Sequence, residues 1–509
     1  MDAEVDVLIV GGGPVGLTAR LLLERWGVRV EVVEKRRELS PFPRSRLVNV
    51  RSMEIFRGLG LAEGIARQAF AAEYGSICFR DTLYDRDFAA ADLVGVRGPV
   101  PESPVTGVVT SQDRLEPLLL AAGESPVRFG AELVGLAEES DGVTASLVDR
   151  ASGAESRVRA SYVLGADGAN STVRELLGIG TDGPGALGSF TTVVFDADLG
   201  HWEARRPAGV YITAHGTFLP LYPEGGWALF GATPDDPGRA DWAETVSRAL
   251  GPRAEGAVKV LRVQHWVMNA FVADRLRSGR VLLAGDAAHS IPITGGLGMN
   301  TGLADVHNLV WKMAGVLRGW ASPALLDSYG PERLSVAHRT LQQAVENARL
   351  MIQVQTRRQE QLRAGDVSAP VELPWSERYF AQLGLVLGVS YRSTAVFGAG
   401  GSGETGTEYV PTAQPGHRVP HLWLGGGRST LDAFGEWFTL LTADAGHWGQ
   451  LTVGDWPLRV ECLPEEHALG LPPQGALLVR PDGHVAARWD ERPPADTALR
   501  DALGALTGC

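Results

Sequence analysis

Cysteine is scarce in this chain of 509 residues, which has only Cys78, Cys462 and Cys509. No two of them have the C-x-x-C spacing of a redox-active or metal-binding pair, and they are too scattered for a disulfide framework. We therefore expect neither disulfides nor a bound metal. So few cysteines are typical of a reducing compartment, and we expect a cytoplasmic protein.

Long hydrophobic runs are missing as well. No apolar stretch reaches the roughly 18 residues of a membrane-spanning helix. Residues 5–10 are apolar, but they follow an acidic start and end in glycines. This pattern predicts a strand, because a signal peptide needs a basic start and a longer apolar segment. We expect no membrane partner.

Positive charge is also in short supply. The formal net charge is -13, and lysine occurs only at Lys35, Lys259 and Lys312. A nucleic-acid surface needs a dense basic patch, so we expect no nucleic-acid partner. With 44% hydrophobic and 21% charged residues, the composition is that of an ordinary soluble protein, and the length predicts two or three domains.

A glycine turn opens the part of the sequence that carries chemistry. Residues 5–35, VDVLIVGGGPVGLTARLLLERWGVRVEVVEK, have the pattern of a strand, a turn, a helix and a second strand. In G-x-G-x-x-G register, such a turn lets a pyrophosphate approach the backbone and the helix N-terminus. The turn residues that we assign to cofactor binding are Gly11, Gly13, Pro14, Val15 and Gly16.

The second strand ends in Glu34, followed by Lys35. A carboxylate at this place accepts both hydroxyls of an adenosine ribose, which favours FAD or NAD over NADP.

Two further segments repeat the pattern of a strand, a loop and a helix. Residues 279–302, GRVLLAGDAAHSIPITGGLGMNTG, contain a strand that ends at Asp286 and a glycine-rich run that leads into a helix. Residues 162–179, YVLGADGANSTVRELLGI, contain a strand, Asp167 and Gly168, and a helix that carries Arg174.

In this order, the three motifs resemble those of the class A flavoprotein monooxygenases, the group typified by para-hydroxybenzoate hydroxylase. The resemblance covers about residues 1–395. It is closest to the branch of aromatic polyketide and phenol hydroxylases, because residues 390–398 (SYRSTAVFG) and 415–424 (PGHRVPHLWL) are similar to the junction with that branch's C-terminal domain.

The resemblance implies tightly bound, non-covalent FAD. It implies that Asp286 binds the ribityl chain and that the backbone of Gly298, Met299 and Asn300 donates to the flavin, where a helix N-terminus stabilises negative charge. Further FAD contacts are implied at Arg44, Gln112 with its neighbour Arg114, Val134 and Asp167. Arg46 is either a second arginine of this kind or a surface charge.

The predicted fold class is α/β, with a Rossmann-like FAD-binding domain interleaved with an antiparallel-sheet substrate domain. We assign residues 1–70, 106–180 and 270–395 to the FAD-binding domain, and residues 71–105 and 181–269 to the sheet domain. Residues 396–509 resemble a thioredoxin-like C-terminal domain that lacks the C-x-x-C pair.

The pattern of the C-terminal region predicts strands over 437–443 and 458–463, a strand pair over 476–489 joined by the turn Pro-Asp-Gly, and a helix over 496–506. Residues 329–355 have helical spacing, and the glycine-rich residues 397–418 are the expected linker.

The alternating pattern of the sheet domain offers candidate walls for a flat aromatic substrate. The candidates are Phe195, Tyr211, Phe218, Leu219, Tyr222, Trp227 and Phe230, with Pro292 from the flavin segment. Each of the aromatic candidates is alternatively part of the sheet core. His215 is a weak candidate for a catalytic base and is alternatively structural; no other catalytic side chain is assigned.

The resemblance also implies the reaction. NADPH or NADH reduces FAD, O2 adds to form a C4a-hydroperoxide, and its terminal oxygen passes to an aromatic carbon of the substrate, for which we expect a polycyclic compound of the polyketide type. A disulfide reductase would need a cysteine pair, and a flavin halogenase a W-x-W-x-I-P motif; neither is present. A Baeyer–Villiger oxygenase and a non-catalytic flavin-bound scaffold remain alternatives, and the sequence does not distinguish a monomer from a homodimer.

Overall fold

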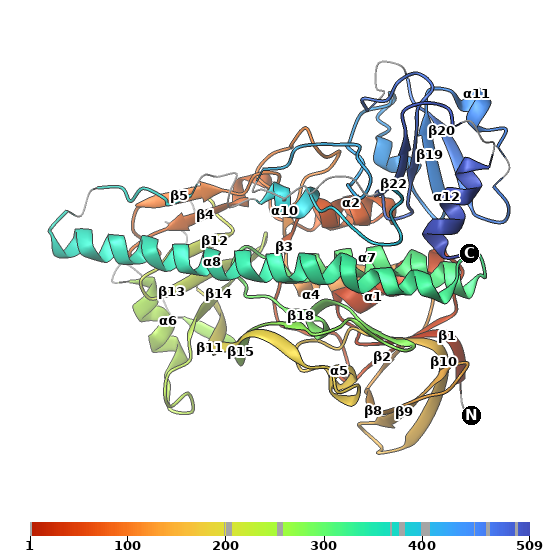
Figure 1. Cartoon of the computed structure of the whole chain (residues 1–509). Helices are drawn as coiled ribbons and strands as arrows, with labels where there is room; N and C mark the ends of the chain where they lie inside the picture. Colours follow the sequence, from red (N-terminus) through yellow and green to blue (C-terminus); the bar gives the residue numbers. More distant parts are fainter. Residues whose placement is uncertain are drawn as a thin grey trace.

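The computed structural model describes residues 3–197, 199, 206–251, 258–366, 369–375, 382–398, 408–451, 453–464, 469–493 and 497–509. Part of the expected linker, residues 399–407, lies outside the described residues. Figure 1 shows two large sheets side by side, a smaller C-terminal module in blue, and the long helix α8 (Tyr329–Arg363) crossing in front of both large sheets.

The first large sheet is built on parallel strands, as the N-terminal motif predicts. Its central strands β1 and β10 are parallel, and β2 and β17 extend the parallel ladder on either side. Across the sheet the strands are β16 (Arg277–Ser278), β17 (Val281–Leu283), β10 (Glu155–Gly165), β1 (Ala3–Val10), β2 (Val30–Glu34) and β7 (Val127–Phe129). The hairpin β8 (Ala131–Glu138) and β9 (Val143–Asp149) joins it through β10.

Helices follow the strand ends of this sheet. The helix α1 (Pro14–Arg25) follows β1 and packs against α7 (Gly298–Leu317) and α4 (Gln112–Ala122). The short helix α5 (Thr172–Leu176) follows β10. The surrounding elements are β3 (Leu47–Val48), α2 (Val50–Gly58), α3 (Ala62–Arg67), β6 (Val108–Val109) and η3 (Pro323–Ser328). The carboxyl ends of β1, β10 and β17 therefore meet at one edge.

The second sheet is mostly antiparallel and draws strands from distant parts of the sequence. In order, its strands are β18 (His289–Ser290), β15 (Lys259–Ala273), β11 (Thr181–Asp196), β14 (Gly225–Ala232), β13 (Gly216–Tyr222), β12 (Val210–Thr213), β4 (Ser76–Phe79) and β5 (Ala89–Asp92). Because β4, β5 and β18 are separate from the rest in the chain, the two sheets are interleaved. The predicted domain boundaries stay a prediction.

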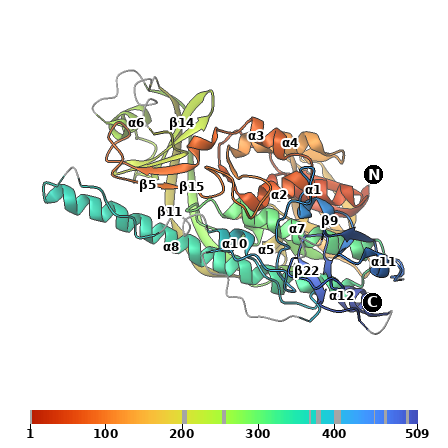
Figure 2. The ribbon, with the colours of Figure 1, turned by 90° about the horizontal axis from the view of Figure 1, so that it is seen from above.

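The two faces of this second sheet have different partners. One face packs against α6 (Trp242–Leu250) through a buried cluster that includes Val193, Leu229 and Val246. The other face packs at its β4 end against α8, through Phe79 and Val354. Figure 2 shows the far end of α8 extending past this sheet.

The C-terminal module contains a four-stranded sheet in the order β20 (Leu458–Cys462), β19 (Phe438–Thr442), β21 (Ala476–Val479) and β22 (Val485–Trp489). The pair β19 and β20 is parallel and the other pairs are antiparallel. Gly483, with φ +78°, turns the chain between β21 and β22, as the Pro-Asp-Gly signal predicts. The helices α10 (Leu383–Leu387), α11 (Ala445–Trp448) and α12 (Ala498–Thr507) and the turns η1 (Ala72–Tyr74) and η4 (Thr430–Ala433) complete the fold.

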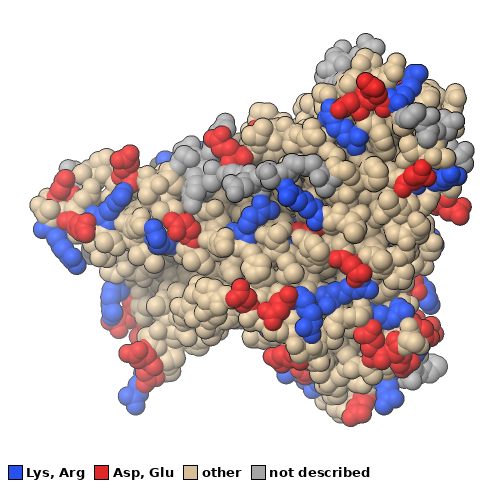
Figure 3. Space-filling model, in the orientation of Figure 1, with Lys and Arg blue, Asp and Glu red and all other residues tan. Residues whose placement is uncertain are grey.

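Acidic and basic side chains are interspersed over the face of the molecule in Figure 3. Among the described residues, no helix is both long enough and apolar enough to cross a membrane.

Candidate functional site

The glycine turn between β1 and α1 is packed so closely that only hydrogen fits at two positions. Gly11 has φ +115°, and a Cβ there would lie 2.2 Å from the carbonyl oxygen of Ala166. A Cβ on Gly16 would lie 2.0 Å from the carbonyl oxygen of Gly11. With Pro14 at the first position of α1, the turn presents backbone N–H groups at a helix N-terminus, which suits a pyrophosphate.

Glu34 ends β2 beside this turn. Its Oε2 accepts a hydrogen bond of 2.9 Å from the Gly12 N–H, and its Oε1 accepts one of 2.9 Å from the Arg36 N–H. The carboxylate is therefore held against the turn, where it can accept ribose hydroxyls. Lys35 follows and is half-buried.

The segment after β17 brings Asp286 to the same edge. Asp286 lies in η2 (Gly285–Ala287), at the edge where β1, β10 and β17 end, and we call this region the flavin cleft. The Asp286 side chain is exposed to solvent, but the protein that surrounds it on the other sides raises the pKa of its carboxyl through burial. A Cβ on Gly298, the first residue of α7, would lie 3.9 Å from Asp286 Oδ1. The loop and the helix N-terminus therefore face one space.

The first N–H groups of α7, on Gly298, Met299 and Asn300, have no acceptor within the helix. The Asn300 side chain is already used: its Oδ1 accepts from the Asn49 N–H at 2.9 Å, and its Nδ2 donates to the carbonyl of Leu47 at 2.8 Å. Only the backbone of Asn300 is thus left to contact a cofactor, as the resemblance implies.

The third motif is tied to the second by an arginine. Asp167 Oδ1 accepts from the Ser171 hydroxyl at 2.5 Å and Oδ2 from the Val173 N–H at 3.1 Å, so it fixes the start of α5; burial raises its pKa. Arg174 donates to the carbonyl of Ala287 at 3.0 Å. All three predicted motifs therefore lie around one cleft.

Arg44 lies in this cleft without a partner. Its guanidinium makes no hydrogen bond or ion pair with another side chain in the described part of the chain, although Glu116, Asp286 and Glu34 are within electrostatic reach. Burial lowers its pKa. A cation kept among carboxylates without bonding to them fits a pyrophosphate.

Glu116, on α4, is a residue of this site that the sequence reasoning missed. It is buried, and Gln112 donates to its Oε1 at 2.7 Å. The spacing of Gln112 and Glu116 along α4 was a usable signal, because side chains at i and i+4 meet on one helix face.

Other predicted residues lie at the junction of the two sheets. Arg46 is not a surface charge: it donates to the carbonyl of Gly209 at 2.7 Å, and burial lowers its pKa to about 10. Arg114 pairs with Glu224 and lies 4.4 Å over the ring of Tyr222. Arg114 is therefore engaged with the second sheet.

Val134 lies on β8 with half of its side chain exposed, and its contact with FAD stays a prediction.

The predicted substrate walls divide between the two faces of the second sheet. Four of them belong to the fully buried cluster against α6, so they are core residues and not walls of a chamber: Phe195, Tyr211, Phe218 and Trp227. Leu219 and Phe230 lie on the opposite face, where Leu219 pairs with Ala228 and Phe230 with Thr192. Alternation predicted the strands but gave no sign of which face is covered.

The face that carries Phe230 also carries two aromatic residues that we did not predict, Phe190 and Trp266. The Phe230 and Trp266 rings are stacked, with centroids 5.5 Å apart, and Phe190 lies 5.2 Å from Phe230. All three are half-buried. Arg262 lies four residues before Trp266 along β15, on the same face of the strand, and it donates to the carbonyl of Pro41, in the loop that leads to Arg44. The aromatic face is therefore turned toward the cleft.

Tyr222, at the end of β13, joins the second sheet to α4, because its hydroxyl donates to Asp113 at 2.5 Å. His215 is exposed on the turn before β13, at the opposite end of that strand from Tyr222. The structure thus does not bring His215 to the cleft.

An apolar pocket opens beside the glycine-rich loop. Its lining includes Leu47 and Asn49 before α2, Gly295 and Leu297 before α7, and Leu383 of α10. Pro292 is buried in the same loop. This pocket adjoins the N-terminus of α7.

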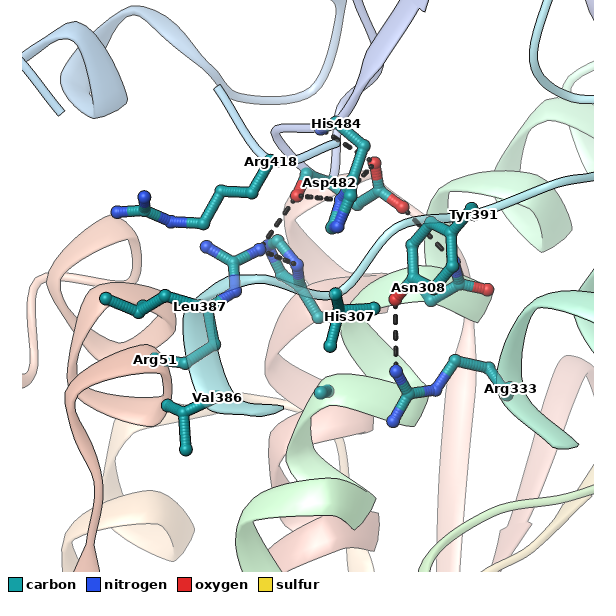
Figure 4. Close-up of a pocket in the computed structure, with 12 residues that line it drawn as sticks. Arg51, His307, Asn308, Arg333, Val386, Leu387, Tyr391, Arg418, Asp482 and His484 are labelled. Carbon is teal, nitrogen blue, oxygen red and sulfur yellow. Dashed lines mark hydrogen bonds and ion pairs between the residues drawn. The ribbon is translucent and has the colours of Figure 1, made fainter. Parts of the chain in front are cut away.

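A second pocket, lined by several charged side chains but by none of the glycine turn, lies between α7, α10 and the C-terminal module (Figure 4). Its arginines are already paired: Arg51 and Arg418 with Glu54, and Arg333 with Asp305 at 2.7 Å. We call the buried ion pairs around it the charged seam, which consists of Arg51, Glu54, Asp305, Lys312, Glu332, Arg333, Arg418, Arg480 and Asp482. The ion pairs of Arg418 with Glu54 and of Arg480 with Glu332 join the C-terminal module to α2 and α8. Because the charges of the seam compensate one another, the seam is not the reactive site.

The residues of the cleft fit FAD. The tight turn and Glu34 suit an adenosine diphosphate, Arg44 is a cation without a protein partner, and the N-terminus of α7 offers N–H groups beside Asp286. No group of three or more potential metal ligands exists among the described residues.

Comparison with known proteins agrees with this geometry. The family model described as "FAD binding domain" matches residues 4–344, and the model described as "Aromatic-ring hydroxylase, C-terminal" matches residues 412–509. Aklavinone 12-hydroxylase DnrF of Streptomyces peucetius is 36% identical, over 90% of this chain and 93% of the relative. Tetracenomycin B2 monooxygenase-dioxygenase of Streptomyces olivaceus is 35% identical, over 98% of each.

Solved structures are similar along the whole chain. The flavin-dependent monooxygenase PieE, in complex with FAD and substrate, has a TM-score of 0.87 and 31% identity, covering 99% of this chain and 98% of its own. Aklavinone-11 hydroxylase, in a ternary complex with FAD and aklavinone, has a TM-score of 0.85 and 33% identity, covering 100% of both chains. On these matches and on the cleft that unites its three motifs, the chain belongs to the FAD-dependent aromatic-ring hydroxylases, a family of monooxygenases.

Proposed function

We propose that this monooxygenase hydroxylates a flat, polycyclic aromatic substrate of the polyketide type, using O2 and NADPH or NADH. The observation that carries the proposal is the three-ring surface of Phe190, Phe230 and Trp266 on the sheet face turned toward the flavin cleft. Aromatic rings in mutual contact offer a broad apolar surface on which a fused-ring substrate stacks.

Relatives support the substrate class. Aklavinone appears in the name of a hydroxylase, and tetracenomycin in that of a monooxygenase-dioxygenase, that match 90% and 98% of this chain. One relative, 4-methyl-5-nitrocatechol 5-monooxygenase of Burkholderia, is 33% identical and is named for a single-ring substrate. The aromatic surface is what favours the larger substrate.

Bound FAD supplies the oxygen chemistry, and the protein supplies position and exclusion of water. Arg44 and the glycine turn hold the pyrophosphate, Asp286 the ribityl chain, and the backbone at Gly298, Met299 and Asn300 the flavin edge. The apolar pocket beside Leu297 and the aromatic face of the second sheet hold the substrate and exclude water from it.

We also propose that the C-terminal module is thioredoxin-like and has no redox role. Its strand order places the parallel pair β19 and β20 on one side and the antiparallel β21 and β22 on the other, as in that fold. Its only cysteines are the unpaired Cys462 and Cys509. The charged seam ties it to α7 and α8, so its function is structural.

The test is turnover with a panel of anthraquinone, naphthacene and simple phenol compounds. We expect a yellow, FAD-bearing protein whose NADPH oxidation and O2 uptake accelerate with a polycyclic compound, which gains one oxygen as a hydroxyl. An ester or a ring-expanded product would instead establish Baeyer–Villiger chemistry. If no compound accelerates NADPH oxidation while FAD is bound, the non-catalytic scaffold becomes the better account.

A further inference from the structure

Glu116 is a buried carboxyl with one oxygen that nothing in the described structure satisfies. The residue is 2% exposed, Oε1 accepts from Gln112 Nε2 at 2.7 Å, and Oε2 has no hydrogen-bond partner among the described residues. A Cβ on Gly13 would lie 4.0 Å from Oε1. The carboxyl is therefore packed against the turn that holds the FAD pyrophosphate.

Three charged groups from other elements face Glu116. Arg44 and Arg36, from the segment after β2, favour its ionised form, and Glu34 at the end of β2 opposes it. Neither arginine is bonded to Glu116 or to any other side chain in the described residues. Burial outweighs the arginines and Gln112, and it raises the pKa of Glu116. The charge of Glu116 is thus not fixed by an ion pair.

FAD changes this balance, because its pyrophosphate carries two negative charges. Arg44 is drawn to the phosphates and compensates Glu116 less, while a like charge arrives at the turn beside this buried carboxyl. We propose that Glu116 is a neutral carboxylic acid in the FAD complex, so that binding FAD takes up one proton at this side chain. In this step, FAD and one proton bind to the protein with its Glu116 carboxylate, and the product is the FAD complex in which Glu116 is protonated. No electrons are transferred.

The other carboxyls of the cleft have different surroundings. Glu34 accepts two backbone N–H groups. Asp167 accepts a hydroxyl and a backbone N–H, but burial outweighs these bonds and raises its pKa. Asp286 has no such donor among the described residues but is open to the solvent of the cleft. Asp286 and Asp167, whose pKa values burial also raises, are therefore the competing sites for the proton, and the test must separate them from Glu116.

The experiment measures FAD affinity and proton uptake, not turnover. Diluted holoenzyme releases FAD, and the fluorescence of free FAD gives Kd from pH 5.5 to 8.5. Mixing FAD with the FAD-depleted full chain in weak buffer, with an indicator dye, counts the protons taken up. For the wild type we expect uptake of up to one proton and an affinity that falls as pH rises, by at most about tenfold per pH unit.

The isosteric variant Glu116→Gln is the decisive comparison. It is expected to take up no proton, to keep its affinity within about twofold across the pH range, and to bind FAD more tightly than the wild type at pH 8.5. The matched variants Glu34→Gln, Asp167→Asn and Asp286→Asn are expected to bind FAD more weakly but to keep the proton uptake. Circular dichroism of each variant checks that it is folded.

Three outcomes would overturn the proposal. The first is that FAD binding to the wild type takes up no proton at any pH tested. The second is that Glu116→Gln keeps the wild-type pH dependence, and loss of the dependence in Asp286→Asn would then assign the proton to Asp286. The third is a folded Glu116→Gln that binds FAD weakly at every pH, because an ionised Glu116 would then be required.

Discussion

Charged side chains are handled in opposite ways in two regions of this molecule, a buried one and one that is open to solvent. In the charged seam, each cation lies within 3.0 Å of a carboxylate oxygen. In the flavin cleft, Arg36, Arg44 and Asp286 have no side-chain partner among the described residues, and Glu116 Oε2 is unsatisfied. Removing charge from water is costly unless it is compensated. The seam compensates it within the protein, whereas the cleft keeps it for a charged ligand.

The comparison predicts that loss of a seam charge damages stability and that loss of a cleft charge damages FAD binding. The strongest test is Glu332→Gln, because Glu332 is bonded to both Arg480 and Lys312. Burial alone would raise the pKa of Glu332, but these two cations hold it well below its usual range. Leaving them uncompensated should lower the apparent free energy of unfolding by about 3–5 kcal/mol, measured by urea denaturation.

The control for this variant is Glu244→Gln on α6, whose partner Arg248 is exposed and one turn away. It should leave the urea midpoint unchanged. An equal loss in both variants, or a folded Glu332→Gln that has lost FAD affinity, would break the distinction between the two regions.

In the cleft, Arg44→Met should weaken FAD binding with little effect on unfolding. Charge-assisted hydrogen bonds contribute about 1.5–3 kcal/mol, which corresponds to a rise in Kd of about ten- to hundredfold. The dependence of Kd on salt should decrease as well. FAD fluorescence titration gives both values, and Arg349→Met, an exposed position on α8, is the control.

Arg418→Met sharpens the same test from the other side, since Arg418 pairs with Glu54 in the seam. It should destabilise the fold while leaving the FAD Kd of the folded protein unchanged. Weakened FAD binding in Arg418→Met, with Arg44→Met unaffected, would contradict the assignment of both regions.

The seam should also make the fold sensitive to mild acid. Burial and the nearby Arg51 lower the pKa of His307 to about 3. Below about pH 6.5, His307 binds a proton in the unfolded chain but not in the folded protein. Its effect on the free energy of unfolding is therefore absent above this pH, and the free energy of unfolding decreases as the pH falls toward 3. His484 shifts in the same direction.

At pH 5 the wild type should have lost about 1–2 kcal/mol through His307 relative to pH 7, and His307→Gln should lose correspondingly less. Urea denaturation of both proteins at the two pH values measures the difference. Losses of equal size in the two proteins would show that His307 is protonated in the folded state.

The sequence predicted which three segments come together, because each of its motifs is a strand followed by a loop. Parallel strands bring their carboxyl ends to one edge, and β1, β10 and β17 are neighbours in this sheet. Gly11, Asp167 and Asp286 therefore meet without any further information. Glu116 was missed because its place beside Gly13 depends on how α4 packs on α1, whereas the i, i+4 spacing with Gln112 indicates only a shared helix face.

The substrate walls were predicted less well for a related reason. Alternation along a strand separates two faces but does not say which face a helix will cover. The aromatic residues Phe195 and Phe230 look alike in sequence, yet α6 covers the face of the first and the cleft adjoins the face of the second. The charged seam was invisible as well, because it joins residues far apart in the chain.

The two faces of the second sheet show the same contrast as the seam and the cleft, but with apolar side chains: one face is covered by protein and the other is left for a ligand. Substitutions on these faces have the smallest predicted effect. Trp266, on the face turned to the cleft, stacks on Phe230 but is only half-buried, whereas Trp227 is buried against α6.

Trp266→Leu removes a stacking contact that contributes about 0.5–1.5 kcal/mol to substrate binding. The KM should therefore rise by about two- to tenfold, and more NADPH should be oxidised without product. Trp227→Leu should lower the unfolding temperature and leave the ratio of product to NADPH unchanged. That ratio, measured for both variants with one hydroxylated substrate, reports which face holds the substrate, and a changed ratio in Trp227→Leu alone would assign the substrate to the face under α6.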